Sequence, residues 1–161
     1  MTAARLLALA AFRDGKYATA CPFYGAERRG APVVSYVRID DRPIRVYSQI
    51  RNPDLVVVLD PSVMEVVDVL HGLKRGGKVL MNGTTTEKIH GVPAFAVDLT
   101  GIALREKLVI AGSPILNTPV LGALAKMGII SVDSAKSAIR EMFSDERNVR
   151  AAEAAFQELV I

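Results

Sequence analysis

The stretch Leu55-Val56-Val57-Val58-Leu59-Asp60-Pro61-Ser62 decides the fold, together with Lys78-Val79-Leu80-Met81 further along the chain. An unbroken run of apolar, mostly β-branched residues is typical of a strand buried on both faces of a parallel sheet. Asp60 can cap a helix whose first residue is Pro61, and we expect that helix to run to about Leu73. A glycine pair then turns the chain into the strand at 78–81, which predicts a βαβ unit.

Before this unit, the sequence predicts a helix, a short extended segment and a hairpin. The Ala- and Leu-rich residues 2–12 favour a helix that ends at Asp14-Gly15, and an extended segment follows at 17–21. Residues 22–32 are a polar, glycine-bearing loop. The segments 33–39 and 44–50 flank the turn signal Asp40-Asp41-Arg42-Pro43, so we expect them to pair as a β-hairpin.

After the βαβ unit, a further strand is expected at 94–99, and the pattern then becomes helical. Helices are predicted near 100–107, 115–127, 131–143 and 146–159. The 161 residues are therefore interpreted as a single domain of the α/β class. We expect three layers around a mostly parallel central sheet, with a β-hairpin and C-terminal helices.

Composition limits the classes of function. Half of the residues are hydrophobic and 23% are charged, which excludes a disordered chain, and we interpret part of the apolar excess as a subunit interface. A net charge of +3 is too small to indicate nucleic-acid binding. The apolar runs are shorter than the roughly 20 residues that cross a bilayer, and no basic segment precedes the apolar N-terminus. We expect no membrane contact and a cytoplasmic location.

The sequence contains few residues that support metal binding or covalent catalysis. Cys21 is the only cysteine, and His71 and His90 are the only histidines, so no metal-ligand spacing exists. We expect Cys21 to be a small buried residue and His71 to face solvent. No Ser, His and Asp set forms a triad, and we assign no catalytic residue and no metal ligand to this chain.

Five residues are candidates for ligand contacts. Arg28 and Arg29 are adjacent guanidinium groups in a Gly-flanked loop and suit a diphosphate or a 3′-phosphate, although a solvated or interface charge pair is the alternative. Asn117 could cap a helix or reach a ligand, and its residue type favours the cap. Asp60 and Asn82 follow predicted parallel strands, where open α/β sheets bind ligands, and a structural role is again the alternative.

Several segments together resemble a known family. They are Pro22-Phe23-Tyr24-Gly25-Ala26-Glu27-Arg28-Arg29-Gly30-Ala31-Pro32, Arg38-Ile39-Asp40 with Pro43-Ile44, Val58-Leu59-Asp60-Pro61-Ser62, Leu73-Lys74-Arg75-Gly76-Gly77, and Asn117-Thr118-Pro119 through Leu121-Gly122-Ala123. In this order and spacing they resemble the gamma subunit, or gamma-equivalent domain, of pyruvate:ferredoxin oxidoreductases. The resemblance covers nearly the whole chain.

The resemblance implies a subunit of a 2-oxoacid:ferredoxin oxidoreductase that is not active alone. Such a complex decarboxylates a 2-oxoacid on thiamine diphosphate, passes electrons through iron–sulfur clusters to ferredoxin and releases acyl-coenzyme A. Thiamine diphosphate, Mg and the clusters belong to partner subunits of alpha, beta and delta type, and coenzyme A is contacted at the subunit interface. By this resemblance Arg28, Arg29 and Asn117 are the expected coenzyme A contacts.

The chain also departs from the family, and other functions remain open. Family members usually begin with a strand and a Gly-rich loop before the segment that is 2–7 here, and we expect that element to be absent. A stand-alone nucleotide-binding domain is one alternative, against which stands the lack of G-x-G-x-x-G after a strand. A purely structural subunit is another. The loop at 22–32 resembles pyruvate-type members more than 2-oxoglutarate-type ones, while branched-chain 2-oxoacids remain open.

Overall fold

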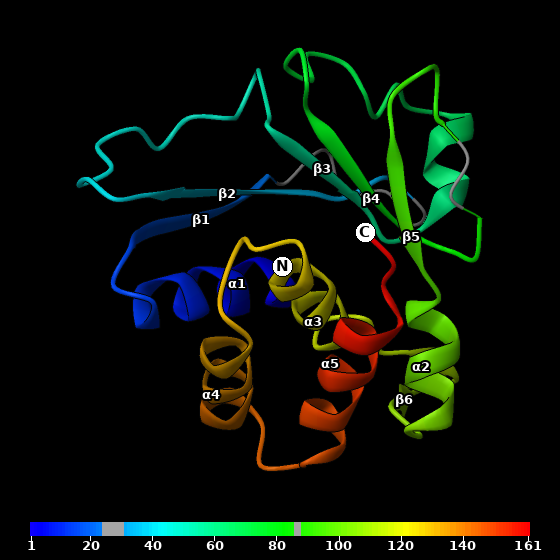
Figure 1. The fold of residues 1–161 in the computed structure, drawn as a ribbon. Helices are drawn as coiled ribbons and strands as arrows, with labels where there is room; N and C mark the ends of the chain where they lie inside the picture. The colour runs from blue at the N-terminus through cyan, green and yellow to red at the C-terminus, as the bar shows by residue number, and fades with distance from the viewer. Residues whose placement is uncertain (24–30, 86–87) are drawn as a thin grey trace.

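The computed structural model describes residues 1–23, 31–85 and 88–161. Its elements, in chain order, are α1 (Thr2–Arg13), β1 (Tyr17–Phe23), β2 (Val34–Asp40), β3 (Leu55–Val58), the 3₁₀ helix η1 (Pro61–Glu65), β4 (Lys78–Asn82), β5 (Ala94–Val97), α2 (Leu99–Arg105), β6 (Val109–Ile110), β7 (Ser113–Pro114), α3 (Pro119–Lys126), α4 (Val132–Met142) and α5 (Arg147–Glu158). Figure 1 shows the α-helices gathered on one side of the strands β1 to β5. The α/β class, with a parallel sheet, an antiparallel hairpin and C-terminal helices, is confirmed.

The parallel sheet has the order β3-β4-β5, and its two faces pack against different layers. On one face, Val58, Val79 and Ala94 form a small core that η1 and the turns after it cover. On the other face, Leu80 and Val97 join the main core, which the helices build. The sheet therefore lies between a helical layer and a thin layer around η1, as alternation of side chains along each strand requires.

The helix predicted from Pro61 to about residue 73 is wrong. Only η1, the 3₁₀ helix at Pro61–Glu65, forms, and turns follow it. The following residues Val66, Val67 and Val69 are β-branched, which lowers helix propensity, and the Asp68 carboxylate accepts a hydrogen bond from the Leu70 backbone N–H at 3.1 Å. This local bond offers the backbone an alternative to a helical turn.

The predicted hairpin between residues 33–39 and 44–50 is also wrong, because β2 pairs with β1 instead. The antiparallel register runs from Tyr17↔Asp40 to Phe23↔Val34. Residues 44–50 form no strand, and the Arg38 guanidinium donates to two of their carbonyls, Ser48 O at 2.6 Å and Gln49 O at 3.2 Å. A side chain rather than a strand pairing therefore holds this segment.

Strand β3 is less buried than the apolar run at 55–59 predicts. It lies at the edge of the sheet, and its Val57 side chain is 37% exposed, whereas Leu80 in the central strand β4 is fully buried. The sequence pattern indicates an apolar environment on both faces, but it does not distinguish a central strand from an edge strand.

The four C-terminal helices are found where they were predicted, although the second of them, α3, begins later. Residues 113–114 pair with β6, so α3 starts at Pro119 rather than at 115. Helices α3 and α5 pack very closely: a Cβ atom placed on Gly122 would lie 1.7 Å from the Ala152 carbonyl oxygen. Only glycine permits this approach of two helix backbones.

Candidate functional site

The carboxyl edge of the parallel sheet is a natural ligand site in an α/β fold, but its polar groups here are bound to the protein itself. The Asn82 amide is buried and donates to Leu59 O at 2.9 Å and to Thr100 Oγ1 at 2.9 Å. Its oxygen accepts from the Thr100 backbone N–H at 3.2 Å. Asn82 therefore ties the end of β4 to the residue after β3 and to the start of α2.

Asp60 at the same edge has the capping role that its position before proline predicts. Its carboxylate accepts from the Ser62 backbone N–H at 3.0 Å and from the Ser62 hydroxyl at 2.7 Å. Hydrogen bonds from the Ser62 side chain and backbone lower the pKa of Asp60 below its usual range. For Asp60 and Asn82 the structure therefore favours the structural interpretation over a ligand contact.

The sequence-predicted ligand residues are not brought together within the described chain. Arg28 and Arg29 lie outside the described residues, and Asn117 precedes α3 as a half-buried residue. Thr118 occupies the N-cap position of α3 with Pro119 after it, so the expectation that Asn117 caps this helix is wrong. No other described residue hydrogen-bonds to the Asn117 side chain, which leaves its amide available for a ligand or a partner.

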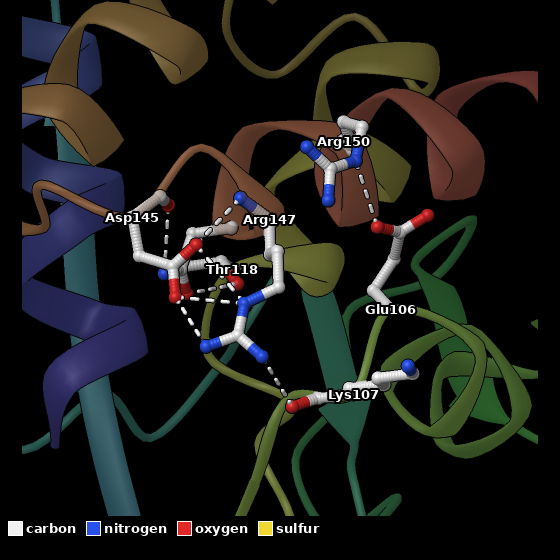
Figure 2. A network of polar contacts seen from close by, with 7 residues as sticks. Glu106, Lys107, Thr118, Asp145, Arg147 and Arg150 are labelled. Atoms are coloured by element: carbon white, nitrogen blue, oxygen red, sulfur yellow. Dashed lines mark hydrogen bonds and ion pairs between the residues drawn. The ribbon is translucent and has the colours of Figure 1, made fainter.

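A polar network that the sequence analysis missed begins at Thr118, the residue that follows Asn117 in the chain (Figure 2). The Thr118 hydroxyl is fully buried and donates to Asn148 Oδ1 in α5 at 3.2 Å. The Asn148 amide, also buried, donates to the Asp145 carbonyl at 3.1 Å. One signal could have revealed it: Asn148 shares the helix face of Ala151, Ala152 and Ala155, and a polar residue in a buried stripe requires partners.

The network continues to the connection between α2 and β6. The Asp145 carboxylate receives both Nε (2.8 Å) and Nη2 (2.6 Å) of Arg147, while Arg147 Nη1 donates to the Lys107 carbonyl at 3.1 Å. The hydrogen bonds from the Arg147 side chain and backbone lower the pKa of Asp145. Beside this pair, Arg150 Nε lies 2.9 Å from Glu106 Oε2. Figure 2 shows these groups meeting at the start of α5.

Other predicted features have the following positions. Cys21 is half-buried rather than buried, with Sγ 3.7 Å from the Tyr47 carbonyl oxygen, and His71 faces solvent as expected. Among the residues that the structure describes, no three His, Cys, Asp or Glu side chains form a group that could hold a metal ion. Within the same ranges, no helix has the length and apolarity needed to cross a membrane.

Comparison with known proteins connects this arrangement to a family of oxidoreductases. The chain matches the family "Pyruvate ferredoxin/flavodoxin oxidoreductase" over residues 1–158. It is 50% identical to the pyruvate/ketoisovalerate oxidoreductases common subunit gamma of Thermococcus kodakarensis, covering 100% of this chain and 91% of the relative. It is 47% identical to pyruvate synthase subunit PorC of Methanothermobacter thermautotrophicus, covering 99% and 88%.

Solved structures agree with the sequence matches. The crystal structure of pyruvate oxidoreductase subunit PORC from Thermotoga maritima superposes with a TM-score of 0.80 at 32% identity, over 99% of this chain and 89% of that one. A 2-oxoglutarate:ferredoxin oxidoreductase from Magnetococcus marinus shares the fold, with a TM-score of 0.75 at 18% identity, over 28% of its length. The fold is thus that of an oxidoreductase subunit, found alone or within a longer chain.

The chain belongs to the pyruvate ferredoxin/flavodoxin oxidoreductase family. The relatives that match it over nearly their whole length are gamma, or PorC, subunits. The family resemblance stated from the sequence is therefore confirmed.

Proposed function

We propose that this chain is the gamma subunit of a 2-oxoacid:ferredoxin oxidoreductase of the pyruvate type. The complex would oxidatively decarboxylate the 2-oxoacid to acyl-coenzyme A and CO₂, with the electrons passed to ferredoxin. The observation that carries the proposal is the identity of 50% to a gamma subunit over the whole of this chain. This agreement favours a subunit of the complex over a stand-alone nucleotide-binding domain.

The proposal places the thiamine diphosphate, Mg and iron–sulfur clusters on alpha, beta and delta-type partners in the cytoplasm. An iron–sulfur cluster is held by several Cys thiolates, and this sequence contains one cysteine. Large apolar side chains exposed on several elements support contact with partner subunits. They include Phe12, Tyr47, Val66, Leu104 and Ile110.

Coenzyme A is the ligand that we assign to Arg28, Arg29 and Asn117. Two adjacent guanidinium groups suit its phosphates, since each offers a planar fork of donors. The side chain of Asn117 is half-buried and has no hydrogen-bond partner among the described residues, which supports a role outside the subunit's own packing. Its amide can donate to and accept from the amide groups of the coenzyme A pantetheine arm.

The first experiment is anaerobic affinity purification of the chain from its host, with mass spectrometry and an assay of coenzyme A-dependent pyruvate oxidation. Thiamine-binding and iron–sulfur subunits should purify with the chain and carry the activity. Arg28→Ala and Arg29→Ala should raise the KM for coenzyme A in the assembled complex, whereas Arg75→Ala, at an exposed turn, should not. A chain that purifies alone and without activity would contradict the proposal, and an unchanged KM would favour a purely structural subunit.

A second candidate function is that of a gamma subunit shared by two complexes with different 2-oxoacid substrates. The Thermococcus kodakarensis relative is a common subunit of pyruvate and ketoisovalerate oxidoreductases, which favours a gamma subunit shared between two complexes. Two sets of thiamine-binding partners in the purification, each with its own 2-oxoacid preference, would support sharing. A single set active on pyruvate alone would limit the chain to the pyruvate enzyme.

A further inference from the structure

The polar network of Figure 2 holds both ends of one loop. Residues 108–117 connect α2 to α3 and contain the β6–β7 hairpin. At the base of the hairpin, the Ile115 N–H donates a hydrogen bond to the Leu108 carbonyl at 2.8 Å. At one end, Arg147 donates to the Lys107 carbonyl. At the other end, Thr118 donates to Asn148. Both anchors lie at the start of α5, so this helix fixes the loop from its two sides.

Thr118 has an unusual role for an N-cap residue. A threonine at this position normally accepts a hydrogen bond from a backbone N–H of the first helical turn. Here the side chain makes no capping bond, and its hydroxyl is directed to Asn148 across the helix interface. The helix loses its side-chain cap, and the backbone that carries Asn117 gains an attachment to α5.

Regular turns shape the loop between its anchors. Lys107, with φ of 57°, ends α2 in the left-handed conformation that is common at helix C-termini, and the Leu108 N–H donates to the Ala103 carbonyl at 2.8 Å. Ala111 and Gly112, with φ of 48° and 80°, form the two-residue turn of the β6–β7 hairpin. Together with the two anchors, these turns hold the loop in one conformation, and among the described residues the Asn117 amide at its end has no hydrogen-bond partner.

We propose that Thr118 and Asn148 are positioning residues for Asn117: their buried hydrogen bond orients its amide toward coenzyme A. This inference rests on the coenzyme A contact proposed above. Asn117 itself touches the ligand, while Thr118 and Asn148 act through it. Loss of the bond lets the amide sample other orientations and weakens coenzyme A binding, without affecting the 2-oxoacid.

The test is a set of variants in the assembled complex, with KM values for coenzyme A and pyruvate and the melting temperature as readouts. Thr118→Val keeps the shape and removes the hydroxyl, and it should raise the KM for coenzyme A about tenfold with the KM for pyruvate unchanged. Thr118→Ser keeps the hydroxyl and removes a buried methyl. It should lower the melting temperature yet leave the KM for coenzyme A near the wild-type value, which a merely structural role would not do.

A double-mutant cycle with Asn117→Ala identifies the route of the effect. If Thr118 acts through Asn117, then Thr118→Val should raise the KM for coenzyme A no further in the Asn117→Ala background. If Thr118→Val raised the KM for coenzyme A equally in the wild-type and Asn117→Ala backgrounds, the inference would be overturned. If Asn117→Ala raised this KM and Thr118→Val did not, the positioning role of Thr118 would be overturned, while the coenzyme A contact of Asn117 would stand. No rise for Asn117→Ala would refute the coenzyme A contact itself, and the inference with it.

Discussion

Replacing Gly122 with alanine should destabilise this chain more than most single substitutions. The added Cβ would lie 1.7 Å from the Ala152 carbonyl oxygen, 2.6 Å from its carbonyl carbon and 2.9 Å from its Cα. A carbon and a carbonyl oxygen normally approach to about 3.3 Å, so helices α3 and α5 must separate by about 1.6 Å. The obstructing atoms are backbone, and no side-chain rotation relieves the clash.

The separation affects a fully buried interface. Residues Pro119–Ala125 of α3 are all buried, and a gap of 0.5–1 Å already removes roughly a quarter to a half of each dispersion contact across it. We expect a loss of at least about 3 kcal/mol in the free energy of unfolding, at the upper end of overpacking effects. For a chain of this size that corresponds to a fall of roughly 6–12 °C in melting temperature.

Urea and thermal unfolding of the purified chain measure this effect, with Gly83→Ala as the matched control. Gly83 has no left-handed φ, and no atom lies within 4 Å of its added Cβ, so its substitution should change stability by less than about 0.5 kcal/mol. If Gly122→Ala unfolded at the same urea concentration as the control, the close packing of α3 against α5 would be refuted.

Three further substitutions test other parts of the fold. Asn82→Leu should cost about 2–3 kcal/mol in urea unfolding, because it leaves the Leu59 carbonyl and the Thr100 N–H without their partner, and an unchanged midpoint would contradict this bridge. Ala111→Gly should raise stability by about 0.5–1 kcal/mol by relieving a φ of 48°, whereas a lower melting temperature would argue against strain there. Burial raises the pKa of Asp14, but hydrogen bonds from Ser131 and Ser134 more than offset it and leave that pKa below 3.8. The stabilisation by the Asp14 carboxylate is therefore complete well above pH 3.8 and is lost as the pH falls through the lower folded-state pKa. Asp14→Asn should make the free energy of unfolding, measured with urea, fall less steeply with decreasing pH in this range.

The sequence predicted the local elements of the fold better than their pairing. The strands β3 and β4, the Asp60 cap and the C-terminal helices depend on neighbouring residues and were found as expected. The partner of β2 was not, because strand composition does not encode which strands meet. The helix predicted after Pro61 does not form beyond η1, because β-branched valines and the turn at Asp68 disfavour a helical backbone there.

The candidate site, too, could be predicted from the sequence only in part. Asn117 could be selected by its place before Thr118-Pro119, whereas the hydrogen bond between Thr118 and Asn148 joins residues 30 positions apart. No spacing rule links those two residues. Only the folded arrangement of α3 and α5 brings them together. The Thr118 side chain then makes no capping bond, and Asn117 has no hydrogen-bond partner among the residues that the structure describes.

The edge position of β3 has a consequence for the biogenesis of this subunit. An edge strand with the run Leu55-Val56-Val57-Val58-Leu59 and an exposed Val57 is a template for pairing with another copy of itself. We therefore expect newly made chains without partners to be prone to self-association at this edge, increasingly so at higher concentration. Balanced synthesis with the other subunits, or a chaperone that shields this edge, would keep the pool of free chains small.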